Sequence, residues 1–144
     1  MTEPVLDSTA TGELAISASD LASALPLDSC DAFPAVFATA RMVALMEIAS
    51  ARLMQPCLAP GQLSGGISVE ATHSAPTPPG ATVTATARYL GRDGKLFLFK
   101  VVASDDAGEV GRATHRRAIV DVERLQGSVA RRIAPSPTRN ERSA

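Results

Sequence analysis

The chain has 144 residues and a formal net charge of −1, and hydrophobic residues make up 45% of it. This length and composition are typical of one globular domain and exclude an intrinsically disordered protein. The near-neutral charge also excludes general electrostatic attraction to nucleic acid, and aromatic residues at 3% leave few side chains on which bases or sugars would stack.

The first residues, which include Glu3 and Asp7, lack the basic stretch and the apolar core of a secretory signal. No apolar run reaches the roughly 20 residues that a membrane-spanning helix needs. We therefore expect a cytoplasmic protein with a disordered N-terminus over residues 1–11, one folded domain over residues 12–125 and a flexible basic tail over residues 126–144.

The first predicted elements are a short strand and a long helix. Residues 12–17 form the candidate strand, and residues 34–54 form the helix. Pro34 suits the first helical position and holds Phe33 outside the α region, so the helix is expected to start there. Pro56 follows its predicted end.

After the helix the apolar period changes to two, which is typical of strands. The predicted strands are residues 66–74, 82–90, 96–103 and 109–122. Asp93-Gly94 indicates a tight hairpin between the second and third of these, and Asp105 begins the next turn. A sheet with one apolar face and a largely apolar helix can bury their apolar surfaces against each other if the sheet wraps the helix. The sequence thus predicts an α+β protein of the hotdog fold, and pairing of exposed sheet edges favours a homodimer.

Two cysteines, Cys30 and Cys57, stand far apart in the chain. They form no C-x-x-C pair, and no histidine lies at ligand spacing from either of them. We expect both to be free thiols and expect no metal site.

Glu47 is the unusual residue of the predicted helix. On a helical wheel it falls on an apolar side, more than about 100° from Arg41 and Arg52. None of the residues three or four positions away is basic, so the helix surface offers no cation. Such a carboxylate either reaches solvent at a groove, bridges to a partner subunit, or acts as a functional acid or base.

Thr39 and His73 are expected to lie near Glu47. His73 is in phase with Ile67 and Val69 on the strand face that should cover the helix. A lone inward histidine is commonly a core residue, but a hydroxyl, a carboxylate and an imidazole that converge in one pocket indicate catalysis. Gly65-Gly66 is either a flexible turn or a place where backbone N–H groups approach a ligand as an oxyanion site.

Several of these stretches resemble the fluoroacetyl-CoA thioesterase family, a branch of the hotdog thioesterases. The similar stretches are residues 33–54 (FPAVFATARMVALMEIASARLM), residues 66–73, residues 71–80 (ATHSAPTPPG) and residues 113–120 (ATHRRAIV). The resemblance extends over roughly residues 33–122. It implies hydrolysis of a short-chain acyl-CoA thioester, with CoA as part of the substrate and no cofactor.

The resemblance also implies roles for particular residues. Thr39, Glu47 and His73 match the catalytic triad of the family, in which the carboxylate attacks the carbonyl or activates water. Three further residues match substrate-binding or supporting positions: the amide of Gly66 polarises the carbonyl, Arg117 supports the site across the dimer interface, and Phe33 lies near the acyl pocket.

Two features depart from the family pattern and bear on fluoroacetyl selectivity. Residues 17–33 form a shorter segment that matches poorly, and Arg41 stands where an apolar residue is expected. Two other functions remain as alternatives. One is cleavage of an acyl group from an acidic carrier protein in a polyketide or fatty-acid pathway, recognised by Arg88, Arg92, Lys95 and Arg116. The other is a hotdog module that binds acyl-CoA without turnover.

Overall fold

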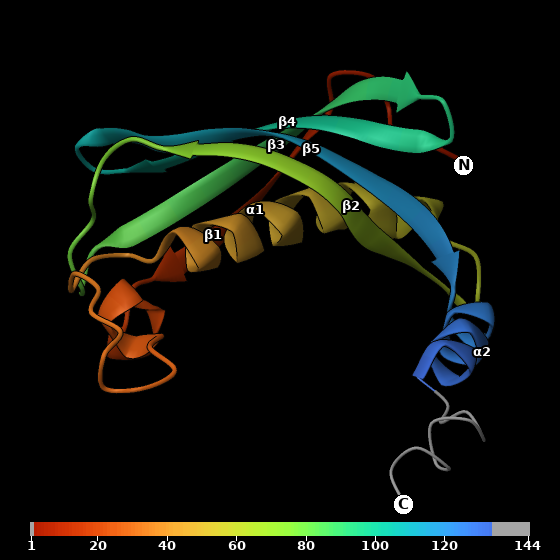
Figure 1. Cartoon of the computed structure of the whole chain (residues 1–144). Helices are drawn as coiled ribbons and strands as arrows, with labels where there is room; N and C mark the ends of the chain where they lie inside the picture. Colours follow the sequence, from red (N-terminus) through yellow and green to blue (C-terminus); the bar gives the residue numbers. More distant parts are fainter. Residues whose placement is uncertain (1, 134–144) are drawn as a thin grey trace, which may run out of the picture.

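The computed structural model describes residues 2–133 and shows a curved antiparallel sheet that wraps one long helix, which is the predicted hotdog architecture (Figure 1). The elements are β1 (Thr9–Ala15), α1 (Thr39–Met54), β2 (Gln62–His73), β3 (Thr82–Asp93), β4 (Leu96–Asp105), β5 (Gly108–Asp121) and α2 (Val122–Ile133). Short 3-10 turns follow β1 and α1.

The sheet has the strand order β1-β3-β4-β5-β2, so β1 and β2 are its edges. The predicted hairpin at Asp93-Gly94 joins β3 to β4, and Gly94 has the left-handed φ of +63° that such a turn needs. The next hairpin joins β4 to β5 and again has a glycine at positive φ, Gly108. Among residues 2–133 β2 pairs with β5 alone, so the backbone groups on its other side have no strand partner there.

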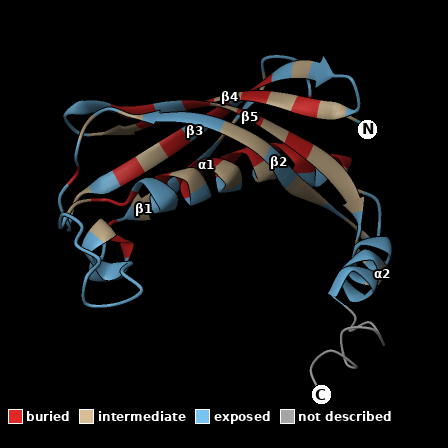
Figure 2. Ribbon diagram, viewed as in Figure 1, coloured by how far each residue is buried: buried red, intermediate tan, exposed pale blue. Residues whose placement is uncertain are grey.

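The hydrophobic core lies between α1 and the concave face of the sheet (Figure 2). From α1 it includes Met42, Leu45, Met46, Ala49, Leu53 and Met54. On the sheet, the alternation predicted for β3 is confirmed, because Val83, Ala85, Ala87 and Tyr89 are buried in turn. Small residues on this face let the helix approach closely, and Gly111 of β5 lies directly against Met42.

The helix begins at Thr39 rather than at Pro34. The residues between them form a bend followed by an extended stretch, in which the N–H groups of Phe37 and Ala38 donate to the carbonyls of Thr77 and Asp20. A bridge between Leu21 and Phe37 holds the same segment. These tertiary bonds take the donors that a first helical turn would leave free, and so they override the local signal of Pro34.

The folded region is longer at both ends than the predicted domain of residues 12–125. β1 begins at Thr9, and the residues before it are anchored rather than disordered, since the buried phenol of Tyr89 donates to Glu3 at 2.6 Å. Burial, followed by the bond to Glu3, raises the pKa of Tyr89. At the other end, residues expected in the flexible tail form α2 up to Ile133, and residues 134–144 lie outside the described residues.

Gly111 gives a test of the packing between helix and sheet. A Cβ at this position would lie 2.5 Å from the Thr72 carbonyl oxygen and 2.6 Å from the Met42 sulfur. We expect Gly111→Ala to lower the free energy of unfolding by about 1–3 kcal/mol, which is typical of an overpacked core. The control is Gly65→Ala, whose Cβ would lie 3.6 Å from Val120. Equal midpoints in urea for the two variants would contradict this packing.

Candidate active site

The candidate site residues come from three elements: α1, the edge strand β2 and its neighbour β5. Glu47 lies in the middle of α1, and its side chain is 40% exposed. Its partner is Arg117 of β5, whose Nη1 donates to the Glu47 Oε1 at 3.2 Å. Among the described residues this is the only hydrogen bond made by the carboxylate.

The Arg117 contact supplies a cation that the helix itself does not offer to Glu47. Glu47 lacks a cation on its own helix, as expected, but it is paired by a residue 70 positions further along the chain. Helical periodicity cannot detect such a partner. The contact lies within one chain, and the support across a dimer interface that the resemblance implied for Arg117 stays a prediction.

Arg117 is itself buried, with 7% of its side chain exposed. Its Nε donates to the Ser64 hydroxyl at 3.0 Å and its Nη2 to the Ser64 carbonyl at 2.8 Å. Its Nη1 also contacts the His115 Nε2 at 3.1 Å. Burial lowers the pKa of Arg117 and Glu47 opposes that shift, and a guanidinium stays charged at any physiological pH.

Gly66 brings the backbone of β2 against the Glu47 carboxylate. A Cβ at this position would overlap Glu47 Oε1 and would lie 3.3 Å from His115 Cε1. Opposite Arg117 the pairing with β5 shifts between Gly66 and Ser68, which is a β-bulge. The absence of a side chain at Gly66 is therefore required for the close approach of the β2 backbone to Glu47. Ile67, which was expected to cover the helix, is the extra residue of the bulge and is 57% exposed.

Thr39 and His73 form a second pair. The Thr39 hydroxyl and the His73 Nδ1 are 2.8 Å apart, and the ring of Phe37 meets the imidazole edge-on at a centroid distance of 6.1 Å. The other ring nitrogen, Nε2, is buried and has no hydrogen-bond partner among the described residues. His73 also lines a hollow of about 240 Å³, together with Val36, Ser74, Ala75 and Pro76.

The structure keeps the two pairs apart within the chain. Thr39 and Glu47 lie about two helical turns from each other, which is roughly 12 Å along the axis of α1. No hydrogen bond among the described residues joins Glu47 to Thr39 or to His73. Within one chain the three side chains thus form two pairs, and their convergence in an assembly of two chains stays a prediction. Phe33 belongs to neither pair and is 51% exposed in the segment before α1.

His115 is the residue of the site that the sequence reasoning missed. It is completely buried on β5, with Nδ1 2.9 Å from the Ser68 carbonyl. The alternation of β5 contains the signal, because it places Ala113, His115 and Arg117 on the buried face.

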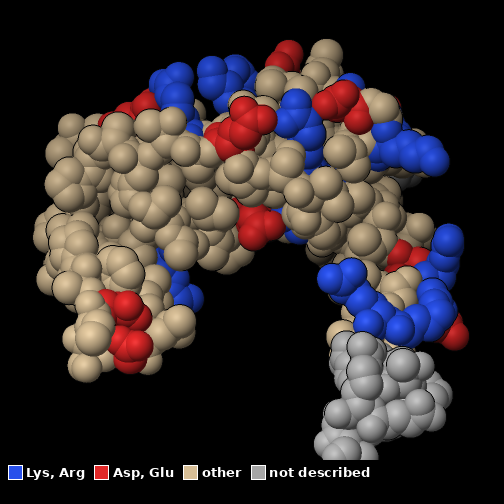
Figure 3. All heavy atoms as spheres, in the orientation of Figure 1, with Lys and Arg blue, Asp and Glu red and all other residues tan. Residues whose placement is uncertain are grey.

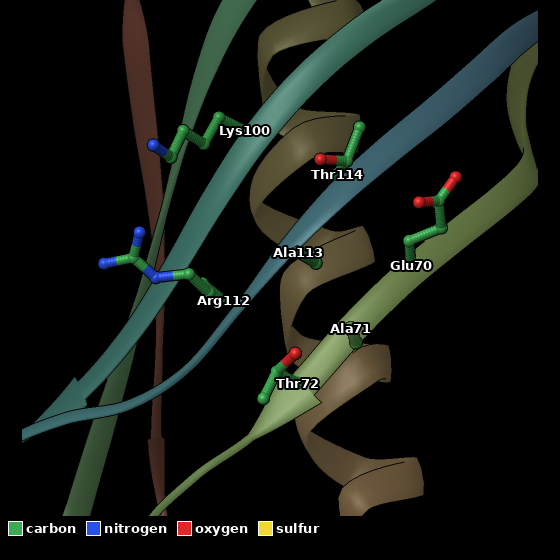
Figure 4. Close-up of a pocket in the computed structure, with 7 residues that line it drawn as sticks. All are labelled: Glu70, Ala71, Thr72, Lys100, Arg112, Ala113 and Thr114. Atoms are coloured by element: carbon green, nitrogen blue, oxygen red, sulfur yellow. The ribbon is translucent and has the colours of Figure 1, made fainter.

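A larger hollow, of about 440 Å³, lies on the outer face of the sheet, with α1 behind it (Figure 4). It is lined by Glu70, Ala71, Thr72, Lys100, Arg112, Ala113 and Thr114. Two hydrogen bonds join Arg112 to Glu109. Lys100 is then the cation of this hollow that has no salt bridge among the described residues. The sheet lies between this hollow and α1, which carries Thr39 and Glu47. In the described part of the chain no hydrogen bond pairs the hydroxyl of Thr72 or Thr114 with a base.

On the face seen in Figure 3 basic and acidic side chains lie among one another. Two of the basic residues considered for a carrier protein contact acids. Arg116 contacts Asp93 at 2.8 Å and Glu70 at 3.8 Å, and Arg92 lies 3.8 Å from Glu3. Within residues 2–133 no three His, Cys, Asp or Glu side chains are grouped so as to hold a metal ion. No helix in that same range is long and apolar enough to cross a membrane.

Several known proteins are similar to this chain in sequence and fold. The family described as fluoroacetyl-CoA-specific thioesterase matches residues 17–123. A fluoroacetyl-CoA thioesterase of Streptantibioticus cattleyicolor is 45% identical over 97 residues, which are 67% of this chain and 70% of that protein.

Solved structures agree with the sequence match. One of the fluoroacetyl-CoA thioesterase has a TM-score of 0.82 at 36% identity, covering 91% of this chain and 98% of that one. A mutant of that enzyme in complex with fluoroacetate and CoA has a TM-score of 0.78 at 37% identity, covering 84% and 98%. A thioesterase superfamily member of Thermus thermophilus, 24% identical with a TM-score of 0.81 over 91% and 94%, shares the fold. The chain therefore belongs to the fluoroacetyl-CoA-specific thioesterase family.

Proposed function

We propose that this protein hydrolyses a short-chain acyl-CoA thioester to the free acid and CoA. The observation that carries the proposal is the Glu47 carboxylate, which Arg117 holds against the backbone at Gly66 while 40% of its side chain stays exposed. The 45% identical relative is a fluoroacetyl-CoA thioesterase, and a solved relative binds fluoroacetate and CoA. We propose that the acyl group is of that small size.

Glu47 can act in either of two ways. In the first, its carboxylate attacks the thioester carbonyl, the C–S bond breaks, and water cleaves the resulting anhydride. In the second, Glu47 takes a proton from a water molecule whose oxygen attacks the same carbon. Both routes consume one water and release a carboxylic acid and a thiol. We propose that the Gly66 amide polarises the carbonyl oxygen in both.

The proposed role of His73 is to protonate the departing thiolate. If the Thr39 hydroxyl donates to Nδ1, then the proton of the neutral ring lies on Nε2. That nitrogen is buried and has no protein partner within the described residues, and His73 is one of the residues that line the small hollow near Val36. A buried polar atom without a partner is costly, so a substrate atom at this place would satisfy it.

We further propose a homodimer. Its interface would be the open edge of β2, where Leu63 and Ile67 are 53% and 57% exposed beside unpaired backbone groups. A second copy there would cover the flank of the site formed by Gly66 and would enclose Phe33 near the acyl group. The free cysteines Cys30 and Cys57 fit a reducing compartment such as the cytoplasm.

The first prediction concerns Glu47→Gln. The amide oxygen can still accept from Arg117, so the fold should persist while the nucleophile or base is lost. We expect kcat to fall about a hundredfold to ten-thousandfold. The measurement is release of free CoA thiol from acetyl-, fluoroacetyl- and propionyl-CoA, with carrier-bound acetate as a further substrate. A Gln variant as active as the wild type would refute the role of Glu47. If the wild type binds acyl-CoA tightly in calorimetry but releases no thiol, the protein is a binding module instead.

The second prediction compares neighbouring glycines. Gly66→Ala places a methyl group where the Glu47 carboxylate lies, so the carboxylate must move away from Arg117. A displacement on the order of 1 Å can cost about a hundredfold in rate, and we expect that loss in kcat. Gly65→Ala meets only Val120 at an ordinary distance and should retain activity. Equal kcat values for the two variants would exclude the close approach at Gly66.

The third prediction concerns the bond between Thr39 and His73. Thr39→Val keeps the shape of the side chain but removes the hydroxyl, and we expect roughly a tenfold loss of kcat for a hydrogen bond worth about 1.4 kcal/mol. Thr39→Ser keeps the hydroxyl and is the matched control. Steady-state kinetics on acetyl-CoA separates the two, and a Val variant as active as the Ser variant would remove this pair from the mechanism.

A further inference from the structure

His115 occupies an unusual place for a core histidine. It is completely buried on β5 and packs against Phe99 of β4 at a ring-centroid distance of 6.2 Å. Each of its two ring nitrogens has one partner: Nδ1 is 2.9 Å from the Ser68 carbonyl of β2, and Nε2 is 3.1 Å from Arg117 Nη1. The imidazole thus connects the β-bulge beside Gly66 to the cation that holds Glu47.

These two partners dictate the protonation of the ring. A carbonyl oxygen can only accept a hydrogen bond, so Nδ1 must carry a proton and donate it to Ser68. A guanidinium can only donate, so Nε2 must present its lone pair to Arg117. His115 is therefore a neutral ring in one defined tautomer.

We propose that His115 is a positioning residue for the thioesterase reaction: its Nε2 accepts one Nη1 hydrogen of Arg117 and so directs the other toward Glu47 Oε1. The inference rests on the proposed function, because it concerns the carboxylate assigned to the chemistry. His115 does not reach the substrate itself. It acts through Arg117, and through Arg117 on the orientation of Glu47.

The other bonds of Arg117 explain why the ring is needed. Ser64 binds Nε and Nη2, which fixes one edge of the guanidinium. Nη1 lies away from that edge, and its two hydrogens are divided between His115 and Glu47. Without an acceptor at the His115 position, one buried hydrogen loses its partner, and the guanidinium is free to tilt away from the Glu47 oxygen.

The charges around His115 agree with a neutral ring. Arg117 on its own strand and Glu47 on α1 are the charged groups that act on it, whereas β2 offers the Ser68 carbonyl and β4 the ring of Phe99. Burial is the largest influence and lowers the pKa of His115, the bond to Ser68 raises it, Arg117 lowers it and Glu47 raises it. The net effect is a lowered pKa, which keeps the Nε2 lone pair available at neutral pH.

Two amide substitutions separate positioning of Arg117 from mere support of the bulge. The short side chain of His115→Asn places its NH₂ near the site of Nδ1, so it can donate to Ser68 but cannot reach Arg117. The longer side chain of His115→Gln places its carbonyl oxygen near the site of Nε2, so it can accept from Arg117. If His115 only anchors the bulge, the Asn variant should be the more active of the two.

The positioning role predicts the opposite order. Against acetyl-CoA we expect His115→Gln to stay within about threefold of the wild-type kcat, and His115→Asn to lose about tenfold to a hundredfold in kcat with little change in KM. Equal activity of the two folded variants, or greater activity of Asn, would overturn the proposal.

A second measurement tests the proposal in the unmodified protein and does not need turnover. The chain has two histidines, so ¹⁵N NMR of the imidazoles at pH 7.5 can assign the ring of His115 by comparison with a His73→Asn sample. We expect a protonated Nδ1 and an unprotonated Nε2 for His115. A proton on Nε2 would overturn the inference even if the enzyme is active. Absence of any turnover with the expected NMR result would instead refute only the proposed function.

Discussion

The site depends on a cation buried in the sheet. The Arg117 guanidinium cannot lose its proton, so its charge and its donors must be satisfied where they lie. Ser64 and His115 accept from its polar edges, and Glu47 supplies the opposite charge at 3.2 Å. A carboxylate that would otherwise turn to solvent is thereby held on the inner side of the sheet. The other parts of the site are the Gly66 backbone and the His115 ring, and both lie against that ion pair.

Backbone geometry provides the space for this arrangement. Gly66 lacks the Cβ that would overlap the Glu47 carboxylate, and the β-bulge that follows it leaves the Ser68 carbonyl to accept from His115. Gly111 likewise lets Met42 of α1 lie directly on β5. Because the helix approaches the sheet this closely, a residue on α1 can be paired by side chains from β5. The close contact between α1 and the sheet therefore serves both the packing of the core and the geometry of the site.

Much of the fold could be predicted from the sequence, because the period of the apolar residues changes once, from helical to alternating, and Asp93-Gly94 marks a tight turn. The start of α1 could not, since carbonyls of Asp20 and Thr77 take the donors that precede it. The side of the helix that bears Glu47 was visible on the helical wheel. Its partner Arg117 was not, because pairing between distant elements leaves no local pattern.

The central claim is that the thioester reacts beside the Glu47 carboxylate, on the inner side of the sheet. A crystal structure of the Glu47→Gln variant with bound acetyl-CoA tests it most directly. The account predicts a thioester carbonyl carbon within about 3.5 Å of the side-chain amide at position 47, near enough for attack. An acyl group bound instead in the outer hollow beside Lys100 and Thr114, with the carboxylate position empty, would contradict it.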